Sequence, residues 1–96
     1  MFVAIADPTR RRLLDLLGAD PGQPVHSLAK PFAMTRPAIS QHLRILRHAG
    51  LVRAEQVGRQ RVYALNPRPL RDVFEWASLY RGLFKDSAGH AWRVHK

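Results

Sequence analysis

One basic, amphipathic stretch in the middle of the chain limits the possible folds more than any other part. It starts at Thr35, whose hydroxyl can cap a helix, and Gly50 can end it. Between them, three apolar residues recur at helical spacing, namely Ile39, Leu43 and Leu46. The pattern predicts an amphipathic helix from Thr35 to about His48. Its other face is polar and basic, and it carries Arg36, Ser40, Gln41, Arg44 and Arg47.

Two short β-prone runs follow this helix, at residues 51–56 and 60–65. A tight turn around Gly58 separates them, and two such runs around a glycine turn are typical of a β-hairpin. The residue next to this glycine, Arg59, is the candidate for the tip of the hairpin. Three arginines lie along the hairpin, namely Arg53, Arg59 and Arg61.

A first helix is expected near the start of the chain. Asp7 can cap it, and Pro8 suits its first turn because the missing N–H of proline has no partner there. Four leucines between residues 13 and 17 form an apolar stripe, and Gly18 is expected to end the helix. A short helical turn over residues 2–6 should pack on the same core.

Turn residues separate the remaining helices. Residues 20–24 have turn chemistry throughout, and a short helix is expected from about Val25 to Lys30. After another break at residues 66–69, apolar residues recur at spacings of three and four, which predicts one last helix from Leu70 to Phe84. It carries too many large aromatic side chains for a free surface. We expect a dimer-packing face, rather than a ligand cage, formed by Phe2, Phe74, Trp76, Tyr80 and Phe84.

The length of 96 residues allows one domain over residues 1–96. The composition of residues 85–96 suits either a flexible tail or an ordered segment. A domain of this size buries only roughly 60 to 65% of its unfolded surface, so a partner subunit should stabilise it. The chain has no cysteine, and residues 1–7 lack a basic leader and a cleavage site. Both features are consistent with a cytoplasmic protein.

The charge of the chain limits the classes of molecule that it is expected to bind. The formal net charge is +9, the sequence pI is about 11.5, and most of the basic residues are arginines, whose planar fork suits phosphate oxygens and guanine edges. No segment approaches the roughly 18 uninterrupted apolar residues of a membrane span, so nucleic acid is favoured over a membrane. An enzyme is not expected. The carboxylates are scattered, and Ser40 and His42 are two residues apart on a helix, where side chains do not face each other.

These elements together describe a winged helix-turn-helix, a mainly α fold with a small β-hairpin. The major groove of DNA admits one helix, which needs an apolar seam toward its own domain and a polar, basic face toward the base edges. The hairpin arginines can then lie along the adjacent backbone or minor groove. We expect Ser40, Gln41 and Arg44 to contact base edges or the backbone of double-stranded DNA. The full candidate surface of the helix is Thr35, Arg36, Pro37, Ser40, Gln41, Arg44 and Arg47.

The sequence also resembles a known family in three runs. They are residues 6–14 (ADPTRRRLL), residues 36–52 (RPAISQHLRILRHAGLV) and residues 58–65 (GRQRVYAL). In order and spacing these runs are similar to the ArsR/SmtB family of bacterial repressors, over nearly all of residues 6–84. The resemblance implies a dimeric repressor whose first and last helices pair across a two-fold axis. Its recognition helix would be Thr35 to Ala49, its wing Arg53 to Tyr63, and its target a pseudo-palindromic operator.

Many members of the ArsR/SmtB family also release DNA when they bind a metal ion or metalloid. The resemblance implies thiolate pairs in the helix before the recognition helix, or Asp and His ligands on the last helix. Residues 25–29 contain no cysteine pair, and the last helix offers Asp72 and Glu75 without a histidine. We therefore expect neither a metal nor another cofactor, and the effector ligand stays unidentified.

Two alternative functions remain open. One is a metal-ion-responsive sensor with His and carboxylate ligands at the dimer interface, to which His90 and His95 could contribute. The other is a protein-interaction module that docks through the aromatic last helix.

The remaining basic side chains have less specific expected roles. His42 should pack or contact a phosphate rather than bind a metal. A run of three arginines should either steer DNA or be occupied by salt bridges or solvent, namely Arg10, Arg11 and Arg12.

Overall fold

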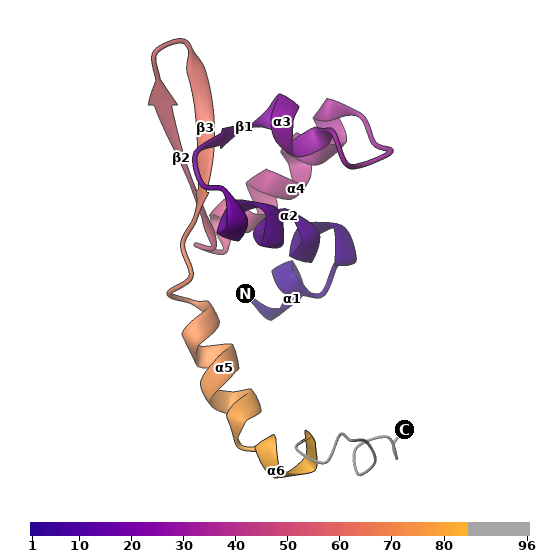
Figure 1. The fold of residues 1–96 in the computed structure, drawn as a ribbon, viewed down its shortest axis with the longest axis vertical. Coiled ribbons are helices and arrows are strands. Elements are labelled where there is room, and N and C mark those ends of the chain that lie inside the picture. The colour runs from indigo at the N-terminus through magenta and orange to yellow at the C-terminus, as the bar shows by residue number, and fades with distance from the viewer. Residues whose placement is uncertain (85–96) are drawn as a thin grey trace.

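The computed structural model describes residues 1–84, which contain six helices and three strands (Figure 1). The helices are α1 (Phe2–Ile5), α2 (Pro8–Ala19), α3 (Val25–Ala29), α4 (Arg36–His48), α5 (Leu70–Ser78) and α6 (Arg81–Phe84), and the strands are β1 (Gln23–Pro24), β2 (Val52–Val57) and β3 (Gln60–Leu65). None of the helices in this part of the chain is long and apolar enough to cross a membrane. The expected tail, with His90 and His95, lies outside the described residues.

Helix α2 is held at both ends by side chains. The carboxylate of Asp7 accepts the backbone N–H of Arg10 at 3.0 Å and caps the N-terminus, as the sequence predicts. At the other end, Nε2 of Gln23 donates to the carbonyl oxygen of Leu16 at 3.1 Å. The predicted end at Gly18 was wrong, because the helix includes this residue and ends one residue later. Gly18 is not among the glycines with positive φ, so it continues the helix instead of terminating it.

The short strand β1 was not expected, because its two residues lie in a segment with turn composition. Gln23 and Pro24 pair antiparallel with Tyr63 and Val62 of β3, which gives a sheet with the order β1-β3-β2. Just before them, the N–H of Gly22 donates to the Tyr63 carbonyl at 2.9 Å. A proline is tolerated here because β1 is an edge strand. The prediction of a turn throughout residues 20–24 was therefore wrong for this strand.

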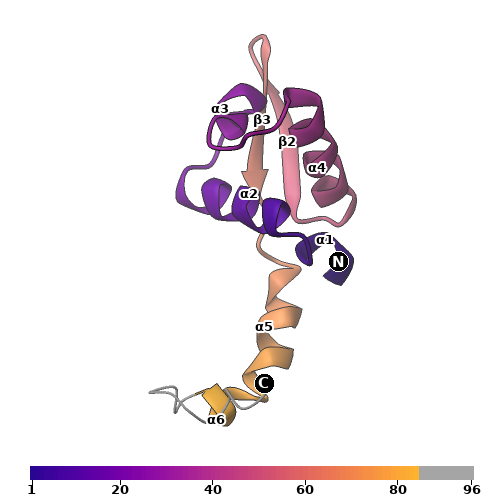
Figure 2. The ribbon, with the colours of Figure 1, turned by 90° about the vertical axis from the view of Figure 1, so that its right-hand side faces the viewer.

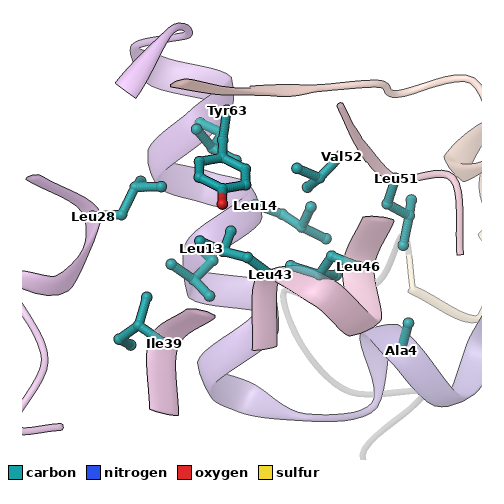
Figure 3. Close-up of a cluster of buried hydrophobic side chains, with 11 residues drawn as sticks. Ala4, Leu13, Leu14, Leu28, Ile39, Leu43, Leu46, Leu51, Val52 and Tyr63 are labelled. Atoms are coloured by element: carbon teal, nitrogen blue, oxygen red, sulfur yellow. The ribbon is translucent and has the colours of Figure 1, made fainter. Parts of the chain in front are cut away.

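The apolar core lies between α2, α3, α4 and the base of the β2–β3 hairpin (Figure 3). The predicted leucine stripe of α2 and the predicted seam of α4 both point into it. Burial of one such side chain stabilises the fold by about 1.5–3 kcal/mol, so the seam holds α4 firmly on the body. The side chains that are essentially inaccessible to solvent are Leu13, Leu17, Leu28, Ile39, Leu43, Leu46 and Leu51.

Helix α5 projects away from the body, at the end opposite the hairpin turn (Figures 1 and 2). The predicted single helix from Leu70 to Phe84 was wrong, because α5 ends at Ser78 and α6 begins after two further residues. The hydroxyl of Ser78 donates to the Phe74 carbonyl at 2.7 Å, and the N–H groups of Leu79 and Tyr80 bond to carbonyls three residues back at 3.1 and 3.0 Å. Such bonds tighten and end a helix. No residue of α5 is buried, so packing does not override them.

Candidate nucleic-acid interface

Helix α4 is fixed at its N-terminus by a capping hydroxyl. Oγ1 of Thr35 accepts the backbone N–H of Ala38 at 3.2 Å. Pro37 occupies the first turn, where a backbone N–H would have no partner within the helix. The helix therefore begins where the sequence predicts, and Thr35, Arg36 and Pro37 are exposed at its open end.

The two sides of α4 differ in chemistry. Ile39, Leu43 and Leu46 are fully buried on one side. At about 100° per residue, the exposed side chains on the other side, most of them polar, span an arc of about 140°. None of them is acidic. We call this surface the basic arc, and it consists of Arg36, Pro37, Ser40, Gln41, Arg44, Arg47 and His48.

Every member of the basic arc except His48 was predicted from the sequence. This residue follows Arg44 by four positions, the spacing that places two side chains on the same helix face. That spacing was the signal that could have found it. His48 is exposed and extends the arc to the C-terminal end of α4.

A tight turn joins the end of α4 to the hairpin. Gly50 has a φ of 78°, its N–H donates to the Arg47 carbonyl at 2.9 Å, and the N–H of Leu51 donates to the Leu46 carbonyl at 3.0 Å. This is a Schellman motif, which favours glycine because L side chains avoid this φ. Asn66 directly follows β3 at the base of the hairpin, and its Nδ2 donates to the Gly50 carbonyl at 2.8 Å. These bonds hold α4 and the hairpin in one relative orientation.

The hairpin of β2 and β3 ends in a two-residue turn made of Gly58 and Arg59. Gly58 has a φ of 63°, while no non-glycine residue within residues 1–84 has a positive φ, which is the φ pattern of a type II′ turn. Nε2 of Gln56 donates to the Gly58 carbonyl at 3.4 Å. Arg59 is exposed at the tip, the position proposed for it from the sequence.

The three hairpin arginines do not form one surface. The strand register pairs Arg53 with Ala64 and Gln56 with Arg61, and side chains alternate between the two faces of a strand. Arg53 and Arg61 therefore lie on opposite faces of the ribbon. Arg53 is also four residues before the end of β2, which separates it from the turn by about 14 Å at about 3.4 Å per residue. Arg59 and Arg61 lie toward the tip, and Arg53 lies at the base.

The surface formed by α4 and the hairpin tip carries charge of predominantly one sign. The sequence contains no acidic residue between Asp20 and Glu55, a span that includes all of α3 and α4. Within the described chain, no carboxylate lies within ion-pair distance of an arginine of the basic arc. Exposed guanidinium groups without nearby carboxylates create a positive potential that attracts a polyanion.

Arg10 connects α1 to the flank of α4. Its Nε donates to the Ala4 carbonyl at 2.8 Å, its Nη2 donates to the Val3 carbonyl at 3.3 Å, and its Nη1 lies 3.2 Å from Nδ1 of His42. His42 is half-buried beside the seam, so it packs against α2, one of the two roles expected for it. The backbone N–H of Arg10 lowers the pKa of Asp7 below its ordinary value, with a smaller effect from the Arg10 charge.

Arg11 and Arg12 also contact groups of the protein. Nη1 of Arg11 donates to the carbonyls of Ile5 and Ala6, each at 3.0 Å. The guanidinium of Arg12 lies over the ring of Phe32, 5.6 Å from its centroid, which is a cation–π geometry. The run of arginines therefore ties α1, α2 and the segment after α3 together, and none of its members lies on the basic arc.

Exposed aromatic rings connect α1 with α5. The rings of Phe2 and Trp76 lie 6.3 Å apart and those of Trp76 and Tyr80 lie 5.6 Å apart, both edge to face. Their side chains are 57%, 54% and 44% exposed, respectively. We call Phe2, Trp76 and Tyr80 the aromatic face. Three further exposed apolar residues were not predicted from the sequence as part of this surface. Val3 lies on α1, Leu79 between α5 and α6, and Leu83 on α6.

Two other residues expected in a dimer-packing face do not join the aromatic face. Phe74 is exposed, but it precedes Trp76 by two residues, and side chains at this spacing do not share a face of a helix. The side chain of Phe84 lies outside the described part of the chain. The acidic residues considered as metal ligands, Asp72 and Glu75, are exposed on α5. Within residues 1–84, no three His, Asp or Glu side chains are grouped to hold a metal ion.

A helix held by an apolar seam, with a basic outer surface and an adjacent hairpin that carries arginines, is the arrangement of winged helix-turn-helix DNA-binding proteins. The family model for a helix-turn-helix domain matches residues 5–55 of this chain. The transcriptional repressor SdpR of Bacillus subtilis is 40% identical over 77 residues, which cover 79% of this chain and 83% of that protein.

Solved structures extend the similarity to the whole fold. A crystal structure of an ArsR family transcriptional regulator matches with a TM-score of 0.73 and 36% identity, covering 88% of this chain and 86% of that chain. A homodimeric winged helix-turn-helix DNA-binding domain from Mycobacterium bovis matches with a TM-score of 0.70 and 25% identity, covering 93% of this chain and 82% of that chain. This chain belongs to the ArsR family of helix-turn-helix transcriptional regulators. These similarities confirm the winged helix-turn-helix fold and the family expected from the sequence. Members of this family are DNA-binding regulators, so the chain is a DNA-binding protein and not an enzyme.

Proposed function

We propose that this chain is a homodimeric repressor that binds a pseudo-palindromic operator, with α4 in the major groove and the hairpin turn on the flanking backbone or minor groove. The basic arc is the observation that carries the proposal. Its side chains are all exposed, while the opposite side of the same helix is buried in the core. Such a helix can enter a groove without losing any contact that holds it to the body.

The position of each side chain along α4 supports a separate role. Ser40, Gln41 and Arg44 lie among the first nine of the 13 residues of the helix, and the N-terminal residues of a recognition helix contact base edges. Thr35 and Arg36 at the start and Arg47 at the end are placed to donate to phosphates on either side, whereas Pro37 has no N–H and offers only apolar contact there. Arg59 and Arg61 near the hairpin turn are assigned to the backbone or minor groove. Arg53 was expected to act with them, and its position at the hairpin base supports another role.

The aromatic face supports a second copy of this chain as the partner. An exposed cluster of large apolar side chains marks an interaction surface, and each aromatic side chain buries about 150–250 Å² when covered. The face combines α1 with α5, so one copy can pair with another around a two-fold axis. The homodimeric relative from Mycobacterium bovis supports this assembly, and the relative named as a transcriptional repressor supports the direction of regulation.

The proposal is tested by selecting bound fragments from random DNA and measuring their affinity by fluorescence anisotropy at several salt concentrations. The selected fragments should share an inverted repeat with half-site centres about 34–36 Å apart. Affinity for this repeat should exceed that for random DNA by about 10³ or more, and both should fall as salt rises. Equal affinity for both DNAs would contradict an operator-specific regulator.

Charge reversal locates the contact surface. Arg44→Glu should abolish operator binding, whereas Arg81→Glu makes the same change in net charge on α6, outside the basic arc, and should retain it. DNA association that survives the triple change of Arg36, Arg44 and Arg47 to Glu would contradict the proposal.

In a transcription assay with the operator across a promoter, the wild-type protein should lower transcript yield. A monomer without DNA affinity would favour a docking module, and release of DNA by zinc or nickel would favour a metal-responsive sensor.

A further inference from the structure

An open pocket lies at the base of the hairpin, where β2, the link to α5 and α5 itself meet. Three arginines line it, namely Arg53 of β2, Arg68 of the link and Arg71 of α5. The ring of Phe74 and the side chain of Leu70 add an apolar part to the lining. We call this the wing-base pocket.

The charges in the wing-base pocket are unbalanced. Its lining contains a single carboxylate, that of Glu75, against three guanidinium groups. Within the described residues, none of these arginines lies within ion-pair distance of a carboxylate. Three cations around one pocket outnumber its single carboxylate, so they repel one another, and the repulsion is relieved when an anion binds between them. The guanidinium fork binds carboxylate and phosphate groups through two parallel hydrogen bonds, so the chemistry of the lining fits an anion.

The wing-base pocket is separate from the surface proposed for DNA. Arg53 lies on the hairpin face opposite to Arg61 and about 14 Å from the turn at about 3.4 Å per residue. Helix α5, which carries Arg71, extends away from the turn (Figure 2). The pocket is also separate from the aromatic face, because Phe74 and Trp76 do not share a face of α5. A ligand in the pocket therefore competes neither with the groove contacts of α4 nor with the proposed dimer contacts.

We propose that the wing-base pocket binds a small organic anion. Its phosphate or carboxylate group lies between the guanidinium groups of Arg53, Arg68 and Arg71, and its apolar part lies against Phe74 and Leu70. An anion in this position bridges the hairpin to α5. The adjacent Asn66 already bonds to the Gly50 carbonyl at the end of α4, so the bridge links α5 to the helix that carries the basic arc.

Binding of the anion is tested without DNA, by NMR titration of the full chain at low ionic strength with phenyl phosphate as the probe. The Nε–H signals of Arg53, Arg68 and Arg71 should shift and saturate, while that of Arg59 at the hairpin tip should move little. Benzoate tests the carboxylate form of the ligand, inorganic phosphate tests the charge without a ring, and phenol tests the ring without a charge. Phenyl phosphate should bind more tightly than inorganic phosphate, and phenol should not bind.

Single substitutions separate a built site from general attraction to a basic protein. Arg71→Gln should weaken phenyl phosphate binding by at least about fivefold, the size expected for losing a hydrogen bond to a charged group. The matched control is Arg81→Gln on α6, outside the pocket, which should leave binding unchanged. Phe74→Leu should bring phenyl phosphate down to the affinity of inorganic phosphate. Equal effects of both arginine changes, or shifts of the same size on Arg59, would overturn the proposal.

Regulation by the bound anion rests on the proposed function, whereas the binding itself does not. Saturating phenyl phosphate should weaken operator affinity by at least about fivefold, because the added negative charge opposes DNA and the bridge restrains α5 relative to α4. Arg71→Gln should remove this effect. A saturated pocket with unchanged operator affinity would overturn the regulatory link. Failure of the wild-type chain to bind any DNA would overturn the proposed function and leave the NMR result intact.

Discussion

Arg44 and Arg59 are both exposed arginines of the proposed DNA surface, but the elements that carry them differ. Arg44 lies on a helix whose seam is buried, whereas Arg59 lies in a two-residue turn. A guanidinium on a fixed helix in the major groove can present two donors to one guanine edge. A guanidinium at a hairpin tip reaches the backbone or a narrow minor groove, which carry less sequence information.

Substitution of each of these two arginines should therefore have a different effect on DNA affinity. Arg44→Ala should cost about 1–3 kcal/mol on the cognate operator and relax the preference at one base pair, while Arg59→Ala should weaken all sequences alike and lower the salt slope by about one. Anisotropy on a panel of singly substituted operators measures both effects. A uniform loss across the panel for Arg44→Ala would assign this residue to the backbone instead.

Asp7 should make the stability of α2 depend on pH. The hydrogen bond from the Arg10 backbone lowers the pKa of Asp7 in the folded protein. A carboxyl of this kind stabilises the fold fully above its unfolded pKa of about 3.9, and this contribution is lost as the pH falls through the lower, folded value. Asp7→Asn keeps a capping oxygen without the charge. Urea denaturation should show a larger loss of stability below about pH 4 for the wild type than for Asp7→Asn, with the two converging at low pH. Parallel curves would contradict this assignment.

The junction between α4 and the hairpin fixes the orientation of the hairpin turn relative to the basic arc, the two proposed DNA contacts. It depends on Gly50, whose φ of 78° is unfavourable for most residues with a Cβ atom. A methyl group there would lie 3.9 Å from Pro69, so space is not the obstacle and the backbone conformation is. The same helix end is also held by Asn66, whose Nδ2 donates to the Gly50 carbonyl.

Gly50→Ala should lower the free energy of unfolding by about 1–2 kcal/mol, because alanine must adopt a left-handed conformation. Gly82→Ala on α6 is the control. Gly82 has no positive φ and no atom within 4 Å of the added methyl group, so this change should be neutral or stabilising by up to about 1 kcal/mol. Urea denaturation measures both variants. An unaltered stability for Gly50→Ala would show that the turn adopts another conformation in solution.

For the whole molecule, the aromatic face should determine the oligomeric state. Trp76 occupies its centre, in contact with Phe2 on one side and Tyr80 on the other. Trp76→Ala should raise the dimer dissociation constant by at least about 30-fold, the effect of losing a central aromatic anchor. Sedimentation over a range of concentrations measures this. Phe74→Ala on the other flank of α5 should leave the dimer intact, and an equal loss for both would place the interface across the entire helix.

The same dimer change should alter DNA binding in a defined way. A monomer carries one basic arc, so Trp76→Ala should bind a half-site about as well as the wild type and lose the additional affinity for the inverted repeat. Full affinity for the repeat in a monomeric variant would contradict the proposed two-fold arrangement.

Local chemistry accounts for the features that were predictable from the amino-acid order. The cap at Thr35, the seam at Ile39, Leu43 and Leu46, and the glycine after α4 all lie within one stretch of chain. Helix caps, helical periodicity and glycine turns act between residues a few positions apart, so a reader of the sequence can recognise them. For this reason α4, the hairpin and the winged helix-turn-helix fold were predicted correctly.

The features that were missed depend on contacts between distant parts of the chain. Strand β1 exists because Gln23 pairs with Tyr63. Helix α5 ends early because none of its residues is buried by packing that could oppose the hydrogen bonds around Ser78. Arg53 had no sequence signal that separated it from Arg61, since strand register and distance from the turn emerge only when β2 and β3 pair. The spacing of residues along the chain does not determine which distant side chains come together, because strand pairing and helix packing do.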